Sequence, residues 1–203
     1  MHPDFSIEAA KIKQGYACIV GVDEVGRGPW AGPVVAAAVC VDPKKIPYGA
    51  TDSKKLSQKK REALATLIMK EAKWAIGESS VEEIDAMNIR EATFLAMERA
   101  IEGLKLSIDY IYVDGNALPK NLPCTAECVI KGDSKVMSIA CASIIAKVYR
   151  DKMMADLAGT YPHYAWERNA GYGTKAHRDG LAIHGVTKHH RQSFKPIKAM
   201  LEA

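Results

Sequence analysis

The stretch Gly21–Val35, GVDEVGRGPWAGPVV, decides the fold because it places two adjacent acids between two apolar segments. The apolar run over residues 15–22 and the run over residues 33–41 are bounded by glycine and proline, which predicts two neighbouring strands joined by the GRGPWAG turn. Carboxylates at the end of a buried strand are costly unless a cation meets them. Asp23 and Glu24 are therefore candidate functional residues.

The composition is that of an ordinary soluble globular protein. With 203 residues, 48% hydrophobic and 26% charged, the chain is long enough for one compact domain with a buried core. No apolar segment reaches the roughly 18 residues of a membrane helix, and the N-terminal segment lacks the pattern of a signal peptide. We therefore expect a cytoplasmic protein without membrane contact. The segment CTAEC, residues 124–128, has no second cysteine pair to complete a metal site, which favours reduced thiols.

Predicted strands and helices alternate along the chain, which indicates a three-layer α/β architecture. The spacing of apolar residues predicts helices over residues 57–70, 88–104 and 138–157. Apolar runs predict further strands over residues 72–79, 110–115 and 127–133. The rest of the chain is polar and basic, and no linker or composition shift marks a second full domain.

Acids stand at the ends of three predicted strands: Asp23 with Glu24, Asp114, and Asp133. Strand ends in α/β sheets border the ligand crevice, so these acids are expected to meet, although each one alone could simply end a strand in water. Four clustered carboxylates stay ionised only with cations between them, and such oxygen ligands select Mg²⁺ or Mn²⁺ over Zn²⁺. Because neighbouring side chains on a strand point to opposite faces, Asp23 and Glu24 require a bulged or turning backbone to share a site.

Two basic runs, residues 52–61 and 187–198, accompany a formal net charge of +4. Such runs form either a solvated face or a surface for nucleic acid, and the composition fits both. The candidates for sequence-independent contacts with phosphates are Lys54, Lys55, Lys147, Lys175 and Arg191.

Six blocks spread over nearly the whole chain resemble ribonuclease HII, the type 2 ribonuclease H family: DEVGRGPWAGPVV, DSKKLS, YVDGN, KGDSK, ASIIAKVYRD and GYGT. Their order and spacing make the resemblance far more specific than any single motif. The resemblance implies an α/β, ribonuclease H-like fold with a mixed central β-sheet flanked by helices. Residues 1–160 would form the catalytic domain, and residues 161–203 a substrate-contacting loop and helical C-terminal extension of the same domain.

The resemblance also implies an activity. The protein would be a monomeric endonuclease that hydrolyses the RNA strand of RNA–DNA hybrids and incises 5′ of single ribonucleotides in duplex DNA, leaving 3′-hydroxyl and 5′-phosphate ends. It would serve ribonucleotide excision repair and the degradation of RNA primers and hybrids. Two divalent ions, Mn²⁺ or Mg²⁺, would activate the attacking water and stabilise the leaving oxygen. The preferred metal and any contact with a replication clamp stay open.

The site residues follow from the matching motifs. The acidic quartet of the family, which holds the metals and is catalytic, falls on Asp23, Glu24, Asp114 and Asp133. Asp151 resembles an additional catalytic acid near the metals. No histidine general base is required, and the pair at 189 and 190 is not a metal motif by its spacing.

Selectivity for RNA depends on the 2′-hydroxyl. The family's ribose-sensing motif falls on Gly26, Arg27 and Gly28, and its tyrosine falls on Tyr172. The glycine-rich backbone can both donate and accept hydrogen bonds. The remaining candidates are Lys54 and Lys147 for the substrate, and Ser134 and Asn116 for orienting the acids, with Ser134 also able to contact substrate.

Three alternative functions predict sequence features that differ from those of ribonuclease HII. Ribonuclease HIII typically has lysine at the position of Arg27 and a long N-terminal domain, which favours HII, although an HIII-like hybrid nuclease without single-ribonucleotide specificity is the second candidate. A binding module with a degraded metal site would lack one of the four acids, and all four are present. A phosphotransferase would show a GxxxxGK[ST] loop, which this sequence lacks. Trp30 departs from the family pattern, which usually has a smaller aliphatic residue there.

Overall fold

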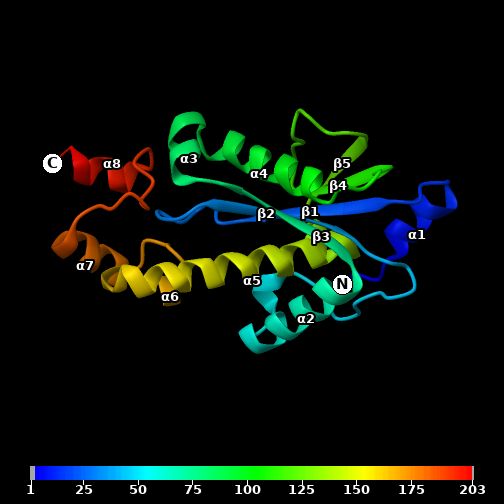
Figure 1. Cartoon of the computed structure of the whole chain (residues 1–203), viewed down its shortest axis with the longest axis horizontal. Helices are drawn as coiled ribbons and strands as arrows, with labels where there is room; N and C mark the ends of the chain where they lie inside the picture. Colours follow the sequence, from blue (N-terminus) through cyan, green and yellow to red (C-terminus); the bar gives the residue numbers. More distant parts are fainter. Residues whose placement is uncertain (1–2, 203) are drawn as a thin grey trace.

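The fold is a mixed five-stranded sheet with helices on both faces (Figure 1). The computed structural model describes residues 3–202. The sheet order is β3–β2–β1–β4–β5, in which β1 pairs antiparallel with β2 and β2 with β3, whereas β1, β4 and β5 run parallel. The strands are β1 (Ile19–Val25), β2 (Val34–Cys40), β3 (Lys73–Ser79), β4 (Tyr110–Asp114) and β5 (Thr125–Val129). This confirms the predicted mixed central sheet flanked by helices.

Three long helices cover the two faces of the sheet. α5 (Met137–Thr160) packs on one face together with α2 (Gln58–Glu71), and α4 (Ile89–Gly103) packs on the other face. The shorter helices are α1 (Ser6–Lys13), α3 (Val81–Met87), α6 (Trp166–Asn169), α7 (Lys175–His184) and α8 (Lys195–Leu201). Three 3₁₀ turns complete the set: η1 (Ser53–Lys55), η2 (Gly132–Ser134) and η3 (Pro162–Tyr164). Within the described residues, no helix is long and apolar enough to cross a membrane.

The start of α5 is fixed against β1 by a close approach and by a remote cap. A Cβ atom at Gly21 would overlap the backbone of Ser138 and Ile139, so only glycine lets β1 and α5 come this near. α5 has no side-chain cap of its own; instead the buried Glu8 accepts hydrogen bonds from Ser138 N at 2.7 Å and Ser138 Oγ at 2.9 Å. Glu8, which lies in α1, therefore provides the acceptor for an N–H group at the N-terminus of α5.

Most predicted elements are confirmed, including the helix over residues 57–70, whose N-cap Ser57 accepts a hydrogen bond from Lys60 N. Two strand boundaries were wrong. The strand predicted over 15–22 runs from Ile19 to Val25, because pairing with β2 continues to Val25–Val35, so the acids lie within it. The strand predicted over 127–133 ends at Val129, because Lys131 adopts a left-handed conformation with φ 56°. Asp133 consequently lies in η2 rather than at a strand end.

Candidate active site

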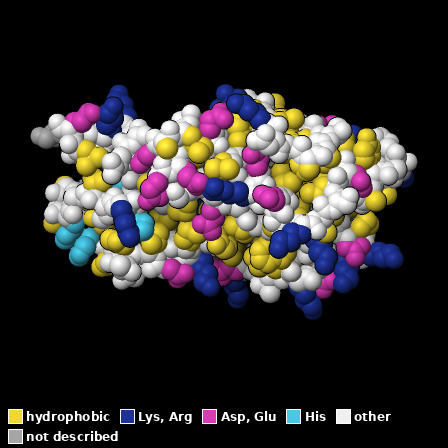
Figure 2. All heavy atoms as spheres, turned by 45° about the horizontal axis from the view of Figure 1, so that its top comes forward, with side chains coloured by type: hydrophobic (Ala, Val, Ile, Leu, Met, Phe, Trp, Pro, Cys, Tyr) yellow, Lys and Arg dark blue, Asp and Glu magenta, His cyan; other side chains and the backbone are white. Residues whose placement is uncertain are grey.

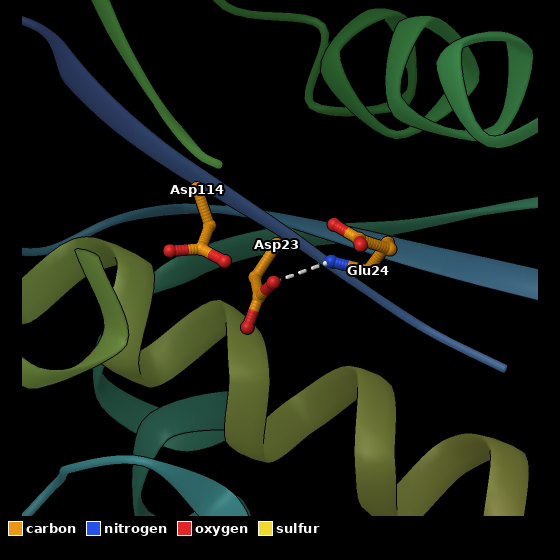
Figure 3. Close-up of side chains that lie close together, drawn as sticks. All are labelled: Asp23, Glu24 and Asp114. Carbon is orange, nitrogen blue, oxygen red and sulfur yellow. Dashed lines mark hydrogen bonds between the residues drawn. The ribbon is translucent and has the colours of Figure 1, made fainter. Parts of the chain in front are cut away.

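Three carboxylates converge beside the end of β4 (Figure 3). Asp23 and Glu24 come from β1 and Asp114 is the last residue of β4, and one oxygen of each lies within 4.8 Å of the others. The requirement for a bulged or turning backbone at Asp23 and Glu24 was wrong, because the β1–β2 ladder stays regular through both residues. β1 pairs with β4 only as far as Val22–Val113, which leaves that edge of β1 open at the acids. Side chains from both faces of β1 can therefore meet at this edge.

Burial and mutual repulsion disfavour the ionised forms of these acids. Asp23 is 5% exposed, and its burial, followed by the charges of Glu24 and Asp114, holds its pKa well above the usual range. Burial likewise raises the pKa of Glu24, against the opposing effect of Arg27, whose Nη1 lies 3.4 Å from Glu24 Oε1. Main-chain N–H groups nevertheless fix two of the acids: Glu24 N donates to Asp23 Oδ1 at 2.7 Å, and Gly132 N donates to Asp114 Oδ1 at 2.6 Å.

The donor set fits a divalent cation. Asp23, Glu24 and Asp114 offer only carboxylate oxygens, the ligands that Mg²⁺ and Mn²⁺ prefer. Burial is the main cause of the raised pKa values of Asp23 and Glu24, and the charge of Asp114 acts in the same direction on both. A bound dication would relieve this repulsion and stabilise the ionised carboxylates.

The carboxylates line a cleft of about 350 Å³ that also gathers most of the other predicted site residues. These residues are Asp23, Glu24, Gly26, Arg27, Gly28, Lys54, Asp114, Asp133, Lys147 and Tyr172. They come from β1, the turn after it, η1, β4, η2, α5 and the loop between α6 and α7. The fold therefore brings residues from the beginning, middle and end of the chain to one cleft.

Asp133 enters this cleft from η2 and lies outside the tight group of three acids. Burial raises its pKa, and the charges of Asp52 and Asp114 act in the same direction. Ser134 Oγ lies 3.3 Å from Asp133 Oδ1, to which it donates, and 3.3 Å from Lys55 Nζ. Ser134 thus contacts an acid without lining the cleft itself. Asn116 lines an adjoining cleft of about 410 Å³ that shares Glu24, Arg27 and Asp114 with the first.

Asp151 is not brought together with the other acids. It lies in a different cleft, between α2, α5 and α6, where it pairs with Lys147 Nζ at 2.6 Å and Arg61 Nη2 at 3.6 Å. Lys147 lines both clefts, so Asp151 contacts a residue of the acid cleft rather than the acids themselves. A catalytic role for Asp151 stays a prediction.

The turn after β1 faces the loop that carries Tyr172. Gly26 is buried with φ 91°, whereas Arg27 and Gly28 are exposed. A Cβ atom at Gly28 would lie 3.2 Å from Tyr172 Cε1, so the ring lies directly against this backbone. Trp30 connects the two segments, because its main-chain N–H donates to Gly171 O at 2.8 Å and its ring packs against Gly173.

The basic candidates divide into two kinds. Lys54 and Lys147 line the cleft, while Lys55 and Lys175 stand exposed beside Asp52 and Asp179. Arg191 was wrongly predicted to contact phosphates. Its side chain is 0% exposed, and its guanidinium donates to main-chain carbonyls of the turn after β1.

Two cleft residues were missed by the sequence reasoning. Ser53 and Ser143 line the cleft beside Asp23, and Ser143 Oγ lies 3.1 Å from Ser53 Oγ. Ser143 belongs to the run of small residues in α5 that helix packing already accounts for, so its composition gave no separate signal. The DSKKLS block did contain Ser53.

Comparison with known proteins decides the family. A family model described as Ribonuclease HII matches residues 20–197. The chain belongs to the ribonuclease HII family. A ribonuclease HII of Ruegeria pomeroyi is 56% identical over 199 residues, which are 98% of this chain and 85% of the relative. That of Jannaschia sp. is 54% identical over 201 residues, 99% of both chains.

Solved structures agree with this family. A crystal structure of ribonuclease H2 from Pyrococcus horikoshii is similar with a TM-score of 0.78 and 26% identity, covering 92% of this ribonuclease HII and 98% of that chain. An Archaeoglobus fulgidus RNase HII, solved in complex with PCNA, is similar with a TM-score of 0.72 and 30% identity, covering 88% and 96%. The protein has the ribonuclease H-like fold and is a divalent-metal-dependent ribonuclease H that hydrolyses the RNA strand of RNA–DNA hybrids.

Proposed function

We propose that this protein also incises 5′ of single ribonucleotides in duplex DNA and leaves 3′-hydroxyl and 5′-phosphate ends. One observation carries the proposal: the exposed backbone of Gly28 and the ring of Tyr172 lie against each other in the same cleft as the acids. A protein distinguishes RNA from DNA through the 2′-hydroxyl. A ribose that contacts Gly28 and Tyr172 would have the phosphodiester of the same nucleotide beside the carboxylates. The nucleotide that is recognised would therefore also be the one that is cleaved.

We propose that Asp23, Glu24 and Asp114, with Asp133, hold two Mg²⁺ or Mn²⁺ ions. When bound, such ions supply activation of the attacking water and stabilisation of the leaving oxygen. The protein's own contribution is orientation: the N–H groups of Glu24 and Gly132 hold the carboxylates of Asp23 and Asp114 in place.

Lys54 and Lys147 supply positive charge on the wall of the same cleft. Their ammonium groups attract the phosphates of the nucleic acid without reading its sequence. We propose that residues 1–160 form the catalytic unit and that residues 161–203 extend it as a substrate-contacting part of the same domain. The end of α5 at Thr160 and the position of Tyr172 in the cleft support this division.

Cleavage of three matched duplexes tests the proposed specificity. The duplexes carry one ribonucleotide, a run of four, or none, and single-turnover rates are measured with Mg²⁺ or Mn²⁺. The wild type should cut the first two and leave the third intact. Tyr172→Ala should slow cleavage at the single ribonucleotide by about tenfold or more while binding to the duplex weakens less, and Tyr172→Phe should lie between.

A matched control is Tyr149→Ala, because Tyr149 is a half-exposed tyrosine on α5 that bonds Glu78 rather than a residue of the cleft. Its rates should equal those of the wild type. Equal single-ribonucleotide rates for the wild type and Tyr172→Ala would remove Tyr172 from the mechanism. A wild type that cuts the run of four but not the single ribonucleotide would instead favour the HIII-like alternative.

A further inference from the structure

Two arginines are buried beneath the turn after β1. Arg150 is 1% exposed and Arg191 is 0% exposed, and neither forms an ion pair with a carboxylate of residues 3–202. Burial lowers the pKa of Arg150 to about 10 and that of Arg191 to about 9. A buried charge without a counter-ion is costly, so its hydrogen bonds must account for its presence.

The guanidinium of Arg191 donates all of its hydrogen bonds to carbonyls of the turn between β1 and β2. Its Nη2 donates to Gly26 O at 2.6 Å and its Nη1 to Arg27 O at 3.0 Å. On the other side of the turn, its Nε donates to Gly32 O at 2.9 Å and its Nη2 to Pro33 O at 3.1 Å. One guanidinium thus holds both ends of the turn and draws the first two carbonyls toward the interior.

The direction of these carbonyls determines the direction of the next N–H groups. In a planar trans peptide the C=O and the following N–H point to opposite sides, and the chain contains no cis peptide among its described residues. With the carbonyls of Gly26 and Arg27 turned inward, the N–H groups of Arg27 and Gly28 point outward, where both residues are exposed. Over residues 3–202, neither N–H group has a hydrogen-bond acceptor.

We propose that Arg191 is a positioning residue of this ribonuclease: by holding the carbonyls of Gly26 and Arg27, it presents the N–H groups of Arg27 and Gly28 to an oxygen of the bound ribonucleotide. The inference rests on the proposed recognition of a single ribonucleotide in this cleft. The sequence predicted that this backbone both donates and accepts hydrogen bonds. Because Arg191 already bonds the carbonyls of Gly26 and Arg27, these two peptide groups can only donate to the substrate. The partner is a hydrogen-bond acceptor, either the 2′-hydroxyl oxygen or a phosphate oxygen.

Arg150 offers a matched control. It is equally buried and donates only to carbonyls, those of Pro33 at 2.9 Å, Ala170 at 2.8 Å and Ala31 at 3.0 Å, none of which belongs to Gly26, Arg27 or Gly28. Lysine keeps the charge at either position but lacks the planar fork of donors that serves several carbonyls at once. Arg150→Lys and Arg191→Lys should therefore lower the thermal midpoint alike, while only Arg191→Lys releases the two inward carbonyls.

The experiment measures single-turnover cleavage of the single-ribonucleotide duplex as a function of enzyme concentration for both variants and the wild type. Arg191→Lys should lower the maximal rate by about tenfold or more relative to Arg150→Lys, with a smaller change in half-saturation. All-DNA duplex is added as a competitor. If the N–H groups contact the 2′-hydroxyl, its inhibition constant stays the same in Arg191→Lys; if they contact a phosphate, it rises.

Equal maximal rates for Arg191→Lys and Arg150→Lys would overturn the inference while leaving the proposed function intact. A wild type that does not cut the single-ribonucleotide duplex would instead contradict the proposed function. A second measurement does not need an Arg191 variant. In Asp114→Asn, the amide proton resonances of Arg27 and Gly28 should shift when the single-ribonucleotide duplex is added, and unshifted resonances would also overturn the inference.

Discussion

At the scale of single residues, Asp23, Glu24 and Asp114 illustrate how this fold holds like charges together. Their oxygens lie within 4.8 Å of one another although burial raises the pKa of Asp23 and Glu24. The main-chain N–H groups of Glu24 and Gly132 orient two of the carboxylates without neutralising them. The arrangement therefore keeps its geometry and its affinity for cations at the same time.

Asp114→Asn should abolish cleavage while binding to the duplex survives. The amide keeps the shape of the side chain and an oxygen that can accept from Gly132 N, but it removes the negative charge that would hold a metal ion. Single-turnover cleavage and duplex affinity are measured side by side. The control is Asp109→Asn, since Asp109 also accepts main-chain hydrogen bonds, from Ala17 N and Cys18 N, outside the cleft. Undiminished turnover by Asp114→Asn would contradict the metal assignment.

The two glycines of the GRG turn should respond differently to alanine. At Gly28 the added methyl group would lie 3.2 Å from Tyr172 Cε1, so Gly28→Ala should displace the ring and slow single-ribonucleotide cleavage without lowering stability. At Gly26, with φ 91°, the methyl group would overlap the Arg150 guanidinium, so Gly26→Ala should cost about 1–3 kcal/mol of unfolding free energy. Urea unfolding and cleavage rates of both variants check the contrast, and similar losses of stability would contradict it.

At the scale of elements, α5 depends on a residue far away in sequence. Glu8 of α1 accepts from Ser138 N and Ser138 Oγ, and this cap and the Gly21 contact place the start of α5 against β1. Since α5 carries Ser143 and Lys147 into the cleft, α1 contributes to the site without touching it.

Glu8→Ala should therefore lower the free energy of unfolding by about 1–3 kcal/mol, the cost of leaving a buried donor unsatisfied. Glu8→Gln should cost less, because its amide oxygen can still accept from Ser138 N. Denaturant unfolding of the two variants measures the difference. Equal losses for the two variants, both of which lack the charge, would show that the charge rather than the acceptor matters.

A buried histidine pair joins α7 to the segment before α8. His177 Nδ1 lies 3.0 Å from the acceptor Tyr172 O, so it carries the proton, and its Nε2 accepts from Trp166 Nε1 at 3.1 Å. His190 Nε2, 3.0 Å from the same Nε2 of His177, must then donate, and its Nδ1 accepts from Thr187 N at 3.0 Å. Each ring is therefore neutral with one defined tautomer.

This pair predicts acid sensitivity. Burial, followed by repulsion from His177 when that ring is also protonated, lowers the pKa of His190 to about 4 from an ordinary 6.5. Because the unfolded state then binds more protons between these values, the contribution of His190 to stability is complete above pH 6.5 and is lost as the pH falls toward 4. Urea midpoints at pH 7.5 and pH 5 should fall further apart for the wild type than for His190→Gln. Equal shifts for both proteins would contradict this assignment.

The sequence predicted those elements whose residues repeat with a clear period. The helix after Ser57 and the apolar strand that ends at Asp114 are examples. β1 was placed too early, because acids within a strand break the apolar pattern that marks it, and only the pairing partner shows that Asp23 and Glu24 remain in the ladder.

The site was predicted through its motifs, whereas the support beneath it was not. An arginine in a basic run ordinarily faces solvent, and nothing local to Arg191 indicates that its acceptors are carbonyls up to 165 positions away. The same holds for Glu8, whose partner lies 130 positions along the chain. Periodicity and motifs report on neighbours in sequence, so contacts of this range become visible only in the folded chain.

At the scale of the whole molecule, the charged side chains on the face shown in Figure 2 are distributed rather than gathered. On the face shown in Figure 2, Lys and Arg side chains stand among Asp and Glu side chains instead of forming one continuous patch. The net charge is +4, and the lysines that line the cleft are Lys54 and Lys147. Attraction for a polyanion should therefore depend on a limited number of local contacts.

Duplex binding should accordingly weaken as salt rises, with a slope of log affinity against log salt of about −0.9 for each phosphate neutralised. Lys54→Ala should reduce the magnitude of this slope by about one and lower affinity equally for every base sequence. Lys13→Ala, at an exposed position of α1 outside the cleft, is the control and should leave the slope unchanged. A slope near zero for the wild type would mean that the lysines only solvate the surface.

The hydrogen bonds from Arg191 to Gly26 and Arg27 can form only after residue 191 has been synthesised. The N-terminal part of the chain is synthesised first, so Asp23 and Glu24 emerge from the ribosome before Arg191. A chain truncated between residues 114 and 172 would possess Asp23, Glu24 and Asp114 but lack both Tyr172 and Arg191. Such chains would carry the three carboxylates without the side chain that holds the carbonyls of Gly26 and Arg27.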